Sequence, residues 1–117
     1  MKKVFLQDLT DFSVAVLEKA GLTRENAQRV TDVLVTTDTF GVLSHGTKNL
    51  YQYILKMEAG GLDAKAEPSV VCEGPSFAVL NGNAAIGMLS ARSAMELAIR
   101  KAKETGIAYV GGRNSCH

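Results

Sequence analysis

The sequence predicts a mixed fold of helices and strands, α+β or α/β, in which an N-terminal three-helix segment leads into the start of a sheet core. Up to about residue 57, apolar residues recur at spacings of three and four, the period of an amphipathic helix. From residue 62 the pattern changes to short β-branched and aromatic runs around Pro68 and Pro75. We therefore expect a helical segment over residues 1–62 and the start of an α/β core over residues 63–117, and we expect that core to be truncated.

Three amphipathic helices are expected in the first segment, over residues 6–20, over residues 24–40 and from about Lys48 to Gly60. Gly21 ends the first helix, and Thr23 can cap the second because its hydroxyl accepts a hydrogen bond from an amide of the first turn. The short connection at Gly21 predicts that these two helices are antiparallel neighbours. The positions expected to face the core follow the helical spacing: Leu9, Phe12, Val16, Leu17 and Ala20; Ala27, Val30, Leu34 and Thr37; Leu50, Tyr53, Ile54 and Met57.

The second segment is expected to contain two short strands, a long helix and a third strand. The strands cover residues 69–73 and 77–80, and the turn Asn81-Gly82-Asn83 then leads into a helix over residues 85–105. That helix is rich in alanine and serine, so we expect it to be packed on two sides. Residues 107–110 are expected to form a buried strand that delivers residues 111–117 at its carboxyl end. Strand, helix and strand predict a crossover unit, and ligands of α/β sheets tend to bind beyond such ends.

Composition and charge narrow the classes of function. The chain has 117 residues, 46% of them hydrophobic, and a net charge of +1, as expected of one soluble globular domain. Without clustered Lys and Arg there is no electrostatic footprint for nucleic acid or for an anionic membrane. The apolar run after Lys3 is too short for a signal peptide, so we expect a cytoplasmic protein. Cys72 and Cys116 lack CxxC spacing and neither histidine has a carboxylate at ligand spacing, so we expect free thiols and no metal site.

Residues that can carry chemistry gather at the corner between the second and third helices, where Ser44, His45 and Gly46 are consecutive. A hydroxyl beside an imidazole combines a hydrogen-bonding group with a group that titrates near neutral pH, and a glycine leaves room for a ligand. His117, at the end of the third strand, is the second candidate. The alternatives are a surface or helix-capping role for His45 and a tag remnant for His117.

An ordered set of short motifs spans the chain: Ser44-His45-Gly46, a tyrosine-containing helix ending at Gly60-Gly61, Pro68-x-Val70, Asn81-Gly82-Asn83, Gly87, Ala94-Met95-Glu96-Leu97-Ala98 and Arg113-Asn114-Ser115-x-His117. Together these motifs resemble the type 2 malate/L-lactate dehydrogenase family. The resemblance implies a non-Rossmann, mixed-sheet oxidoreductase that uses NAD or NADP and works as a homodimer or higher oligomer. It also implies hydride transfer between nicotinamide and a 2-hydroxy or 2-oxo acid such as malate, lactate or ureidoglycolate.

The same resemblance implies roles for individual residues. His45 corresponds to the active-site histidine of the family's Ser-His-Gly motif, and Ser44 to its substrate-contacting neighbour. His117 corresponds to the second active-site histidine, which is the proton acceptor in ureidoglycolate-type members. Three residues after Gly46 the family usually has an arginine, whose guanidinium can grip a carboxylate through two hydrogen bonds. This chain has Asn49 there, beside Lys48, and we expect both residues to contact the substrate. No cofactor-binding residues are recognisable, so we expect the 117-residue chain to be inactive without the polypeptide that carries them.

Three other interpretations remain open at this stage. A non-catalytic helical subunit or remnant of a split dehydrogenase gene would keep the packing residues and lose the cofactor site. A DNA-binding helical domain would need basic residues clustered on one helix, and these are not seen. A plain helical interaction module would leave both histidine motifs unexplained.

Overall fold

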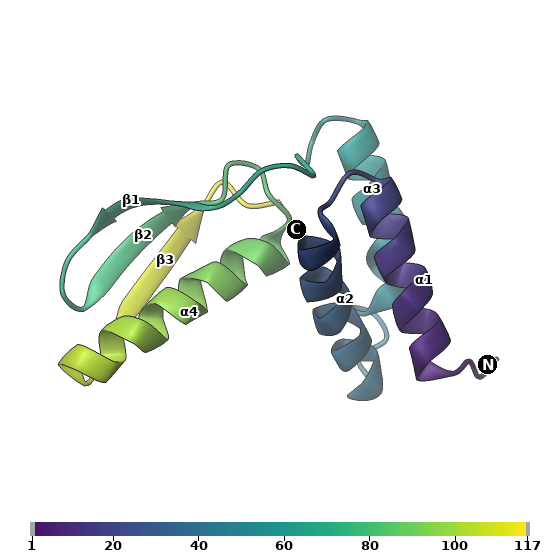
Figure 1. Cartoon of the computed structure of the whole chain (residues 1–117), viewed down its shortest axis with the longest axis horizontal. Coiled ribbons are helices and arrows are strands. Elements are labelled where there is room, and N and C mark those ends of the chain that lie inside the picture. The colour runs from purple at the N-terminus through teal and green to yellow at the C-terminus, as the bar shows by residue number, and fades with distance from the viewer. Residues whose placement is uncertain (1, 117) are drawn as a thin grey trace. The chain divides into compact units, whose positions relative to one another are not determined.

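The structure, a computed structural model, describes residues 2–116 and divides between Gly60 and Gly61 into two compact units (Figure 1). The first unit is helical and carries the Ser44-His45-Gly46 motif. The second unit contains the sheet and the Arg113-Asn114-Ser115 stretch. The predicted order of helices and strands is confirmed.

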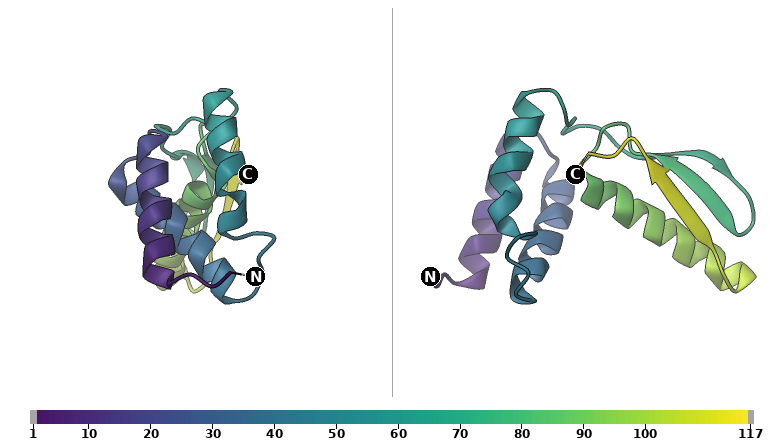
Figure 2. Two further views of the ribbon diagram at one scale, coloured as in Figure 1. Left: turned by 90° about the vertical axis from the view of Figure 1, so that its right-hand side faces the viewer. Right: turned by 180° about the vertical axis from the view of Figure 1, so that it is seen from behind.

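The first unit consists of α1 (Leu6–Lys19), α2 (Arg24–Thr39), the short 3-10 helix η1 (Thr47–Asn49) and α3 (Leu50–Glu58). Helices α1 and α2 pack against each other and run in opposite directions, as the short connection predicted (Figure 2). The Thr23 hydroxyl caps α2 by accepting a hydrogen bond from the Asn26 amide at 3.2 Å. A cap of this kind satisfies one of the amides that the first helical turn leaves unpaired.

The core of the first unit lies between the facing stripes of α1 and α2. Leu17, Val30 and Leu34 are almost completely buried, as expected from the helical spacing. The expected stripe of α1 is wrong at Phe12, whose side chain is 62% exposed, and Ser13 is buried in its place. Ser13 can be buried because its hydroxyl donates to the Leu9 carbonyl at 2.7 Å within the same helix. Ala27, Leu50 and Tyr53 are also buried as expected. The remaining expected positions are half-buried: Leu9, Val16, Ala20, Thr37, Ile54 and Met57.

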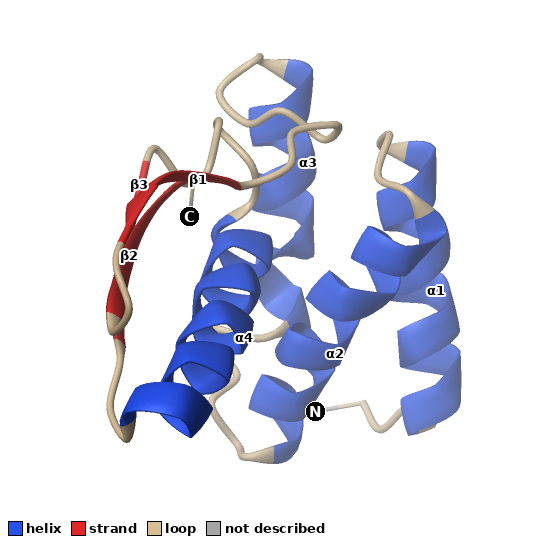
Figure 3. Ribbon diagram, turned by 60° about the vertical axis from the view of Figure 1, so that its left-hand side comes forward, coloured by secondary structure: helices blue, strands red, loops and turns tan. Residues whose placement is uncertain are grey.

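The second unit is a three-stranded mixed sheet with one long helix on one of its faces (Figure 3). It contains β1 (Ser69–Glu73), β2 (Phe77–Asn81), α4 (Gly87–Thr105) and β3 (Tyr109–Arg113). Strands β1 and β2 are antiparallel, whereas β2 and β3 are parallel and are joined through α4, so the predicted crossover unit is confirmed. Ala78, Leu80 and Leu97 form the buried cluster between sheet and helix, with Ala94 and Val110 packed against it.

Several boundaries in the second unit differ from the prediction, and β2 ends at Asn81 instead of residue 80. Helix α4 begins at Gly87 instead of residue 85, and β3 covers Tyr109–Arg113 instead of residues 107–110. The expectation of a buried third strand is wrong, because Tyr109 is 76% exposed and Ile107, which precedes the strand, is 77% exposed. Among residues 2–116, β3 pairs with β2 on one side only, so no further strand or its side chains lie beside β3 on its other side.

An ion pair ties α4 to the turn between β1 and β2. The Lys101 ammonium donates to the Gly74 carbonyl at 2.8 Å and lies 2.7 Å from the Glu73 carboxylate. The hydrogen bond from Lys101, together with its positive charge, holds the pKa of Glu73 below its usual range.

No helix among residues 2–116 is long and apolar enough to cross a bilayer.

Burial predicts different responses at two leucines of α1. Leu17 is fully buried, so Leu17→Ala should remove packed atoms and lower the free energy of unfolding by about 2–5 kcal/mol. Leu6 is 54% exposed, and the matched change Leu6→Ala should cost less than about 0.5 kcal/mol. Urea unfolding followed by circular dichroism measures both, and equal losses for the two variants would contradict the assigned core.

Candidate active site

The Ser44-His45-Gly46 motif lies in a loop that leaves the C-terminus of α2 by a defined turn. Gly41 adopts a φ of +80°, a conformation that glycine reaches without a steric penalty. Its amide donates to the Asp38 carbonyl at 2.9 Å, and the Val42 amide donates to the Thr37 carbonyl at 3.1 Å. This pair of bonds is the Schellman arrangement, which satisfies the last carbonyls of a helix and fixes the direction of the departing chain.

Ser44 and His45 are hydrogen-bonded to each other within the loop. The Ser44 Oγ lies 2.8 Å from the His45 Nδ1, and both side chains are exposed. The His45 amide donates to the Val42 carbonyl at 3.0 Å, so its backbone is held while its ring faces solvent. The arrangement provides an imidazole with one nitrogen engaged by a hydroxyl and the other available to a ligand.

Asp38, in the last turn of α2, holds the segment that follows His45. Its Oδ2 accepts hydrogen bonds from the Thr47 amide at 3.0 Å and from the Thr47 hydroxyl at 2.5 Å. Gly46 is buried against the same carboxylate, and a Cβ at that position would fall on the Asp38 side chain. Gly46 is therefore required by close contact with a neighbouring side chain, and the room it leaves is occupied by Asp38 instead of a ligand.

Asp38 and Thr47 were not predicted from the sequence. A signal was present, because Asp38 is an acidic residue in the last turn of a helix, where the helix dipole disfavours negative charge. A carboxylate in such a position needs donors from elsewhere. A threonine shortly after the helix is one residue type that can supply both an amide and a hydroxyl.

Lys48 and Asn49, the predicted substrate-binding residues, follow directly in η1. The Asn49 side-chain amide donates to the Ser44 carbonyl at 2.9 Å, so one of its hydrogens stabilises the loop. Lys48 is exposed and forms no ion pair with any residue in the part of the chain that the structure describes. Ser44, His45, Lys48 and Asn49 thus share one short segment of the first unit.

The second motif lies beyond the carboxyl ends of the parallel strands β2 and β3, where the crossover rule places ligand sites. Asn81 Oδ1, at the end of β2, accepts from the Asn83 amide at 3.1 Å and from the Asn114 side chain at 3.0 Å. The Cys116 amide donates to the Ala85 carbonyl at 3.0 Å, and the Cys116 carbonyl accepts from the Gly87 amide at 2.6 Å. These bonds fix the approach to His117, which itself lies outside the described residues.

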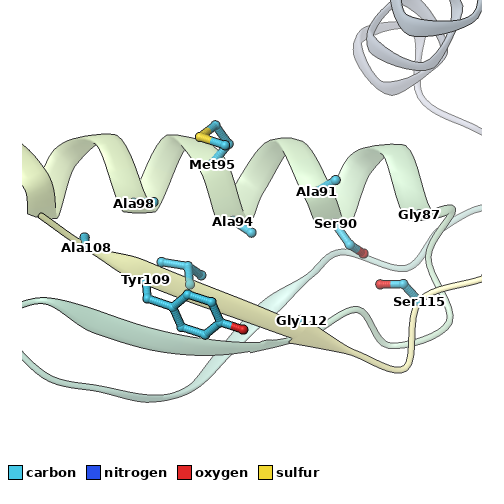
Figure 4. Close-up of a pocket in the computed structure, with 11 residues that line it drawn as sticks. Gly87, Ser90, Ala91, Ala94, Met95, Ala98, Ala108, Tyr109, Gly112 and Ser115 are labelled. Carbon is cyan, nitrogen blue, oxygen red and sulfur yellow. The ribbon is translucent and has the colours of Figure 1, made fainter.

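A groove of about 540 Å³ runs between α4 and β3 of the second unit. Its walls are mostly small or apolar, and Figure 4 shows the hydroxyls of Ser90 and Ser115 at the end near Gly87. Ser90 is 5% exposed, and its hydroxyl has no hydrogen-bond partner among residues 2–116. The groove borders the free edge of β3.

Three of the first four backbone amides of α4, those of Gly87, Leu89 and Ser90, already have partners, so this helix N-terminus is not an open cradle for the phosphates of a dinucleotide. Such a cradle uses unpaired amides at a helix N-terminus. At the start of α4 the Gly87 amide donates to the Cys116 carbonyl, and the Leu89 and Ser90 amides donate to the Ile86 carbonyl at 3.0 and 3.5 Å.

Within residues 2–116 no group of three or more His, Cys, Asp or Glu side chains is placed to hold a metal ion. Cys72 and Cys116 are free cysteines.

Among residues 2–116, four α-helices, one 3-10 helix and a mixed three-stranded sheet define an α+β fold. The sequence matches the malate/L-lactate dehydrogenase family over residues 4–117, and the chain belongs to this family. The resemblance inferred from the motifs is thereby confirmed.

Individual relatives support this assignment. Malate dehydrogenase of Pyrococcus horikoshii is 42% identical over 109 residues, which are 93% of this chain and 30% of the relative. Ureidoglycolate dehydrogenase (NAD(+)) of Escherichia coli K12 is 38% identical over 93 residues, 80% of this chain and 27% of the relative. The solved structure of malate dehydrogenase from Pyrococcus horikoshii OT3 has a TM-score of 0.96 and 40% identity, covering 99% of this chain and 33% of that chain. The chain corresponds to the amino-terminal portion of these relatives and spans about a third of their length.

The contact between Gly46 and Asp38 predicts a specific sensitivity. Gly46→Ala should force the carboxylate away from Thr47 and destabilise the first unit by about 1–3 kcal/mol, the usual range for overpacking. Gly112→Ala is a suitable control, because nothing lies within 4 Å of the added Cβ and the change should stay within about 0.5 kcal/mol. Thermal unfolding measures the stability of both variants. The contact between Gly46 and Asp38 is contradicted if Gly46→Ala is as stable as the control.

Proposed function

We propose that this chain is the proton-handling portion of an NAD- or NADP-dependent oxidoreductase that interconverts a 2-hydroxy acid and the corresponding 2-oxo acid. Family membership supports the proposal, and the two relatives above are named for malate and ureidoglycolate, both of which are 2-hydroxy acids. The observation that carries it is the exposed imidazole of His45, held by the Ser44 hydroxyl on an otherwise fixed loop.

The chemistry of alcohol oxidation explains why a histidine belongs there. Converting a carbinol to a carbonyl removes a hydride from carbon 2 and a proton from the hydroxyl oxygen. A bound nicotinamide would supply the hydride acceptor. The proton needs a base, and an imidazole is suited to this near neutral pH. His45 takes that proton at Nε2 during oxidation and returns it to the carbonyl oxygen during reduction. His117, which follows the anchored Asn114-Ser115 turn, is the second proposed catalytic histidine and the alternative acceptor of the same proton.

A carboxylate accompanies the reacting carbon in every substrate of this class. The family's usual guanidinium is replaced here by Asn49, whose amide already bonds the Ser44 carbonyl. We assign the carboxylate contact mainly to the Lys48 ammonium, which is exposed and forms no ion pair with any residue between 2 and 116. Ser44 and the second hydrogen of the Asn49 amide would add neutral hydrogen bonds. An ammonium grips a carboxylate less specifically than a guanidinium, so binding of the substrate should be looser.

The cofactor and the assembly complete the proposal. Because the Gly87, Leu89 and Ser90 amides at the start of α4 already have backbone partners, we propose that the phosphates of NAD or NADP are held by parts of the enzyme outside residues 2–116. We also propose a homodimer or higher oligomer in the cytoplasm, with no nucleic-acid or membrane partner. The alternative function, a non-catalytic helical subunit of a split dehydrogenase, keeps the packing but loses turnover.

The function is tested on protein isolated from its own cells, so that any accompanying polypeptide is retained. We expect malate, lactate or ureidoglycolate to be oxidised with NAD or NADP, as measured by absorbance of the reduced nicotinamide. His45→Ala and His117→Ala should each lower turnover by roughly two to four orders of magnitude, as expected for a lost general base. Gln52→Ala, an exposed change on α3, serves as the control. An effect on KM alone would demote either histidine to binding, and no turnover with any 2-hydroxy acid would favour the non-catalytic subunit.

The role of Lys48 makes a separate prediction. Lys48→Met removes the charge while keeping most of the length of the side chain, so KM for the 2-oxo acid should rise about tenfold or more with little change in kcat. Lys103→Met, an exposed lysine of α4, should leave both parameters unchanged. Steady-state kinetics with paired 2-oxo acid and amide substrates checks the assignment. It is wrong if Lys48→Met weakens the two substrates equally.

A further inference from the structure

Asp38 occupies an unfavourable position for a carboxylate. It lies in the last turn of α2, at the negative end of the helix dipole, and that turn contains no basic residue. Asp38 is half-buried, which adds a desolvation cost. Both costs are offset by the amide and hydroxyl of Thr47, at 3.0 and 2.5 Å from Oδ2. The carboxylate therefore acts nine residues away, on the segment that follows His45.

The backbone around His45 is fixed from both sides. Before it, the His45 amide donates to the Val42 carbonyl, and Val42 is itself bonded to Thr37 of α2. After it, Gly46 packs on the Asp38 carboxylate. Asn49 adds a third restraint, through its hydrogen bond to the Ser44 carbonyl. The backbone before and after His45 is thus tied to α2 or to the turn that ends it.

The side chains carried by this fixed backbone are exposed. Neither Ser44 nor His45 contributes to the core, so the restraints are not needed to bury them. We propose that Asp38 is a positioning residue, which holds Gly46 and Thr47 so that the His45 ring keeps Nδ1 on the Ser44 hydroxyl and presents Nε2. The significance of this role for proton transfer rests on the dehydrogenase function proposed above, but the geometry can be tested without it.

The Ser44 hydroxyl can donate to Nδ1 or accept from Nδ1–H, and proton exchange at Nε2 of the neutral ring requires the second arrangement. A hydroxyl oxygen can accept from Nδ1–H both when the imidazole is neutral and when it is protonated. In that arrangement Nε2 has the free lone pair when the ring is neutral and acts as a base. When the ring is protonated, Nε2 carries the proton that the ring donates as an acid. The same geometry serves both directions of the reaction, provided that the loop does not move, and Asp38 supplies that condition.

The proposal is tested by nitrogen-15 NMR of the two histidine rings at pH 8, above the ordinary imidazole pKa of about 6.5. His45→Gln assigns the signals, because the chain has 2 histidines. In the unmodified protein we expect Nδ1 of His45 to be the protonated nitrogen. Asp38→Ala and Thr47→Val should move both nitrogens toward the averaged values of free imidazole. Asp38→Asn and Thr47→Ser, which keep an acceptor and a hydroxyl donor, should retain most of the original pattern.

The control is Asp32→Ala, an exposed aspartate of the same helix, which should leave the His45 signals unchanged. If Asp38→Ala does not fold, Thr47→Val, which removes one hydrogen bond, carries the test. A lowered melting temperature with unaltered His45 nitrogens would reduce Asp38 to a structural role and overturn the proposal, as would a His45 ring protonated at Nε2 in the unmodified protein. The NMR measurement needs no substrate or cofactor. Its result therefore tests the role of Asp38 even if the protein has no dehydrogenase activity. In an active enzyme, Thr47→Val should lower kcat roughly ten- to a hundredfold, and Thr47→Ser should restore it.

Discussion

In each unit a single side-chain oxygen accepts two hydrogen bonds and thereby fixes the loop that carries a motif. In the first unit Asp38 Oδ2 receives the amide and the hydroxyl of Thr47. In the second unit Asn81 Oδ1 receives the Asn83 amide and the Asn114 side chain. Ordering the residues of an exposed loop costs conformational entropy. Two hydrogen bonds to one acceptor offset more of that cost than a single bond would. The positions of His45 and of the Asn114-Ser115 turn depend on these two acceptors.

Periodicity and turn residues predicted the order of the helices and strands, and the failures have identifiable physical causes. Helical spacing could not decide between Phe12 and Ser13, because it does not reveal that the Ser13 hydroxyl bonds its own helix at Leu9. The third strand was placed too early because Gly111 and Gly112 have low strand propensity. The extent of β3 is set by its parallel pairing with β2, in which Gly111 lies opposite Val79. Because these two residues are far apart in the sequence, no local pattern contains the pairing.

The candidate site was predictable where its residues are consecutive and not where they meet through folding. Ser44 and His45 are neighbours in the sequence, and their side chains are indeed within hydrogen-bonding distance. The restraint from Asp38 spans nine residues and the end of a helix, so no local pattern contains it. What the sequence did contain was a conflict, an acidic residue at the negative end of a helix. Local conflicts of this kind are where functional geometry is often found.

Helix α4 follows a strand and a glycine-containing turn, as the first helix of dinucleotide-binding folds does, but the amide of its first residue has a different partner. In those folds the helix amides remain unpaired and meet a phosphate. Here the Gly87 amide donates to the Cys116 carbonyl at 2.6 Å, and the Cys116 amide donates to Ala85. The Gly87 amide is thus used to anchor Cys116, the last described residue before His117. The same amide cannot also bind a phosphate, so the backbone bond at Gly87 and a phosphate contact there exclude each other.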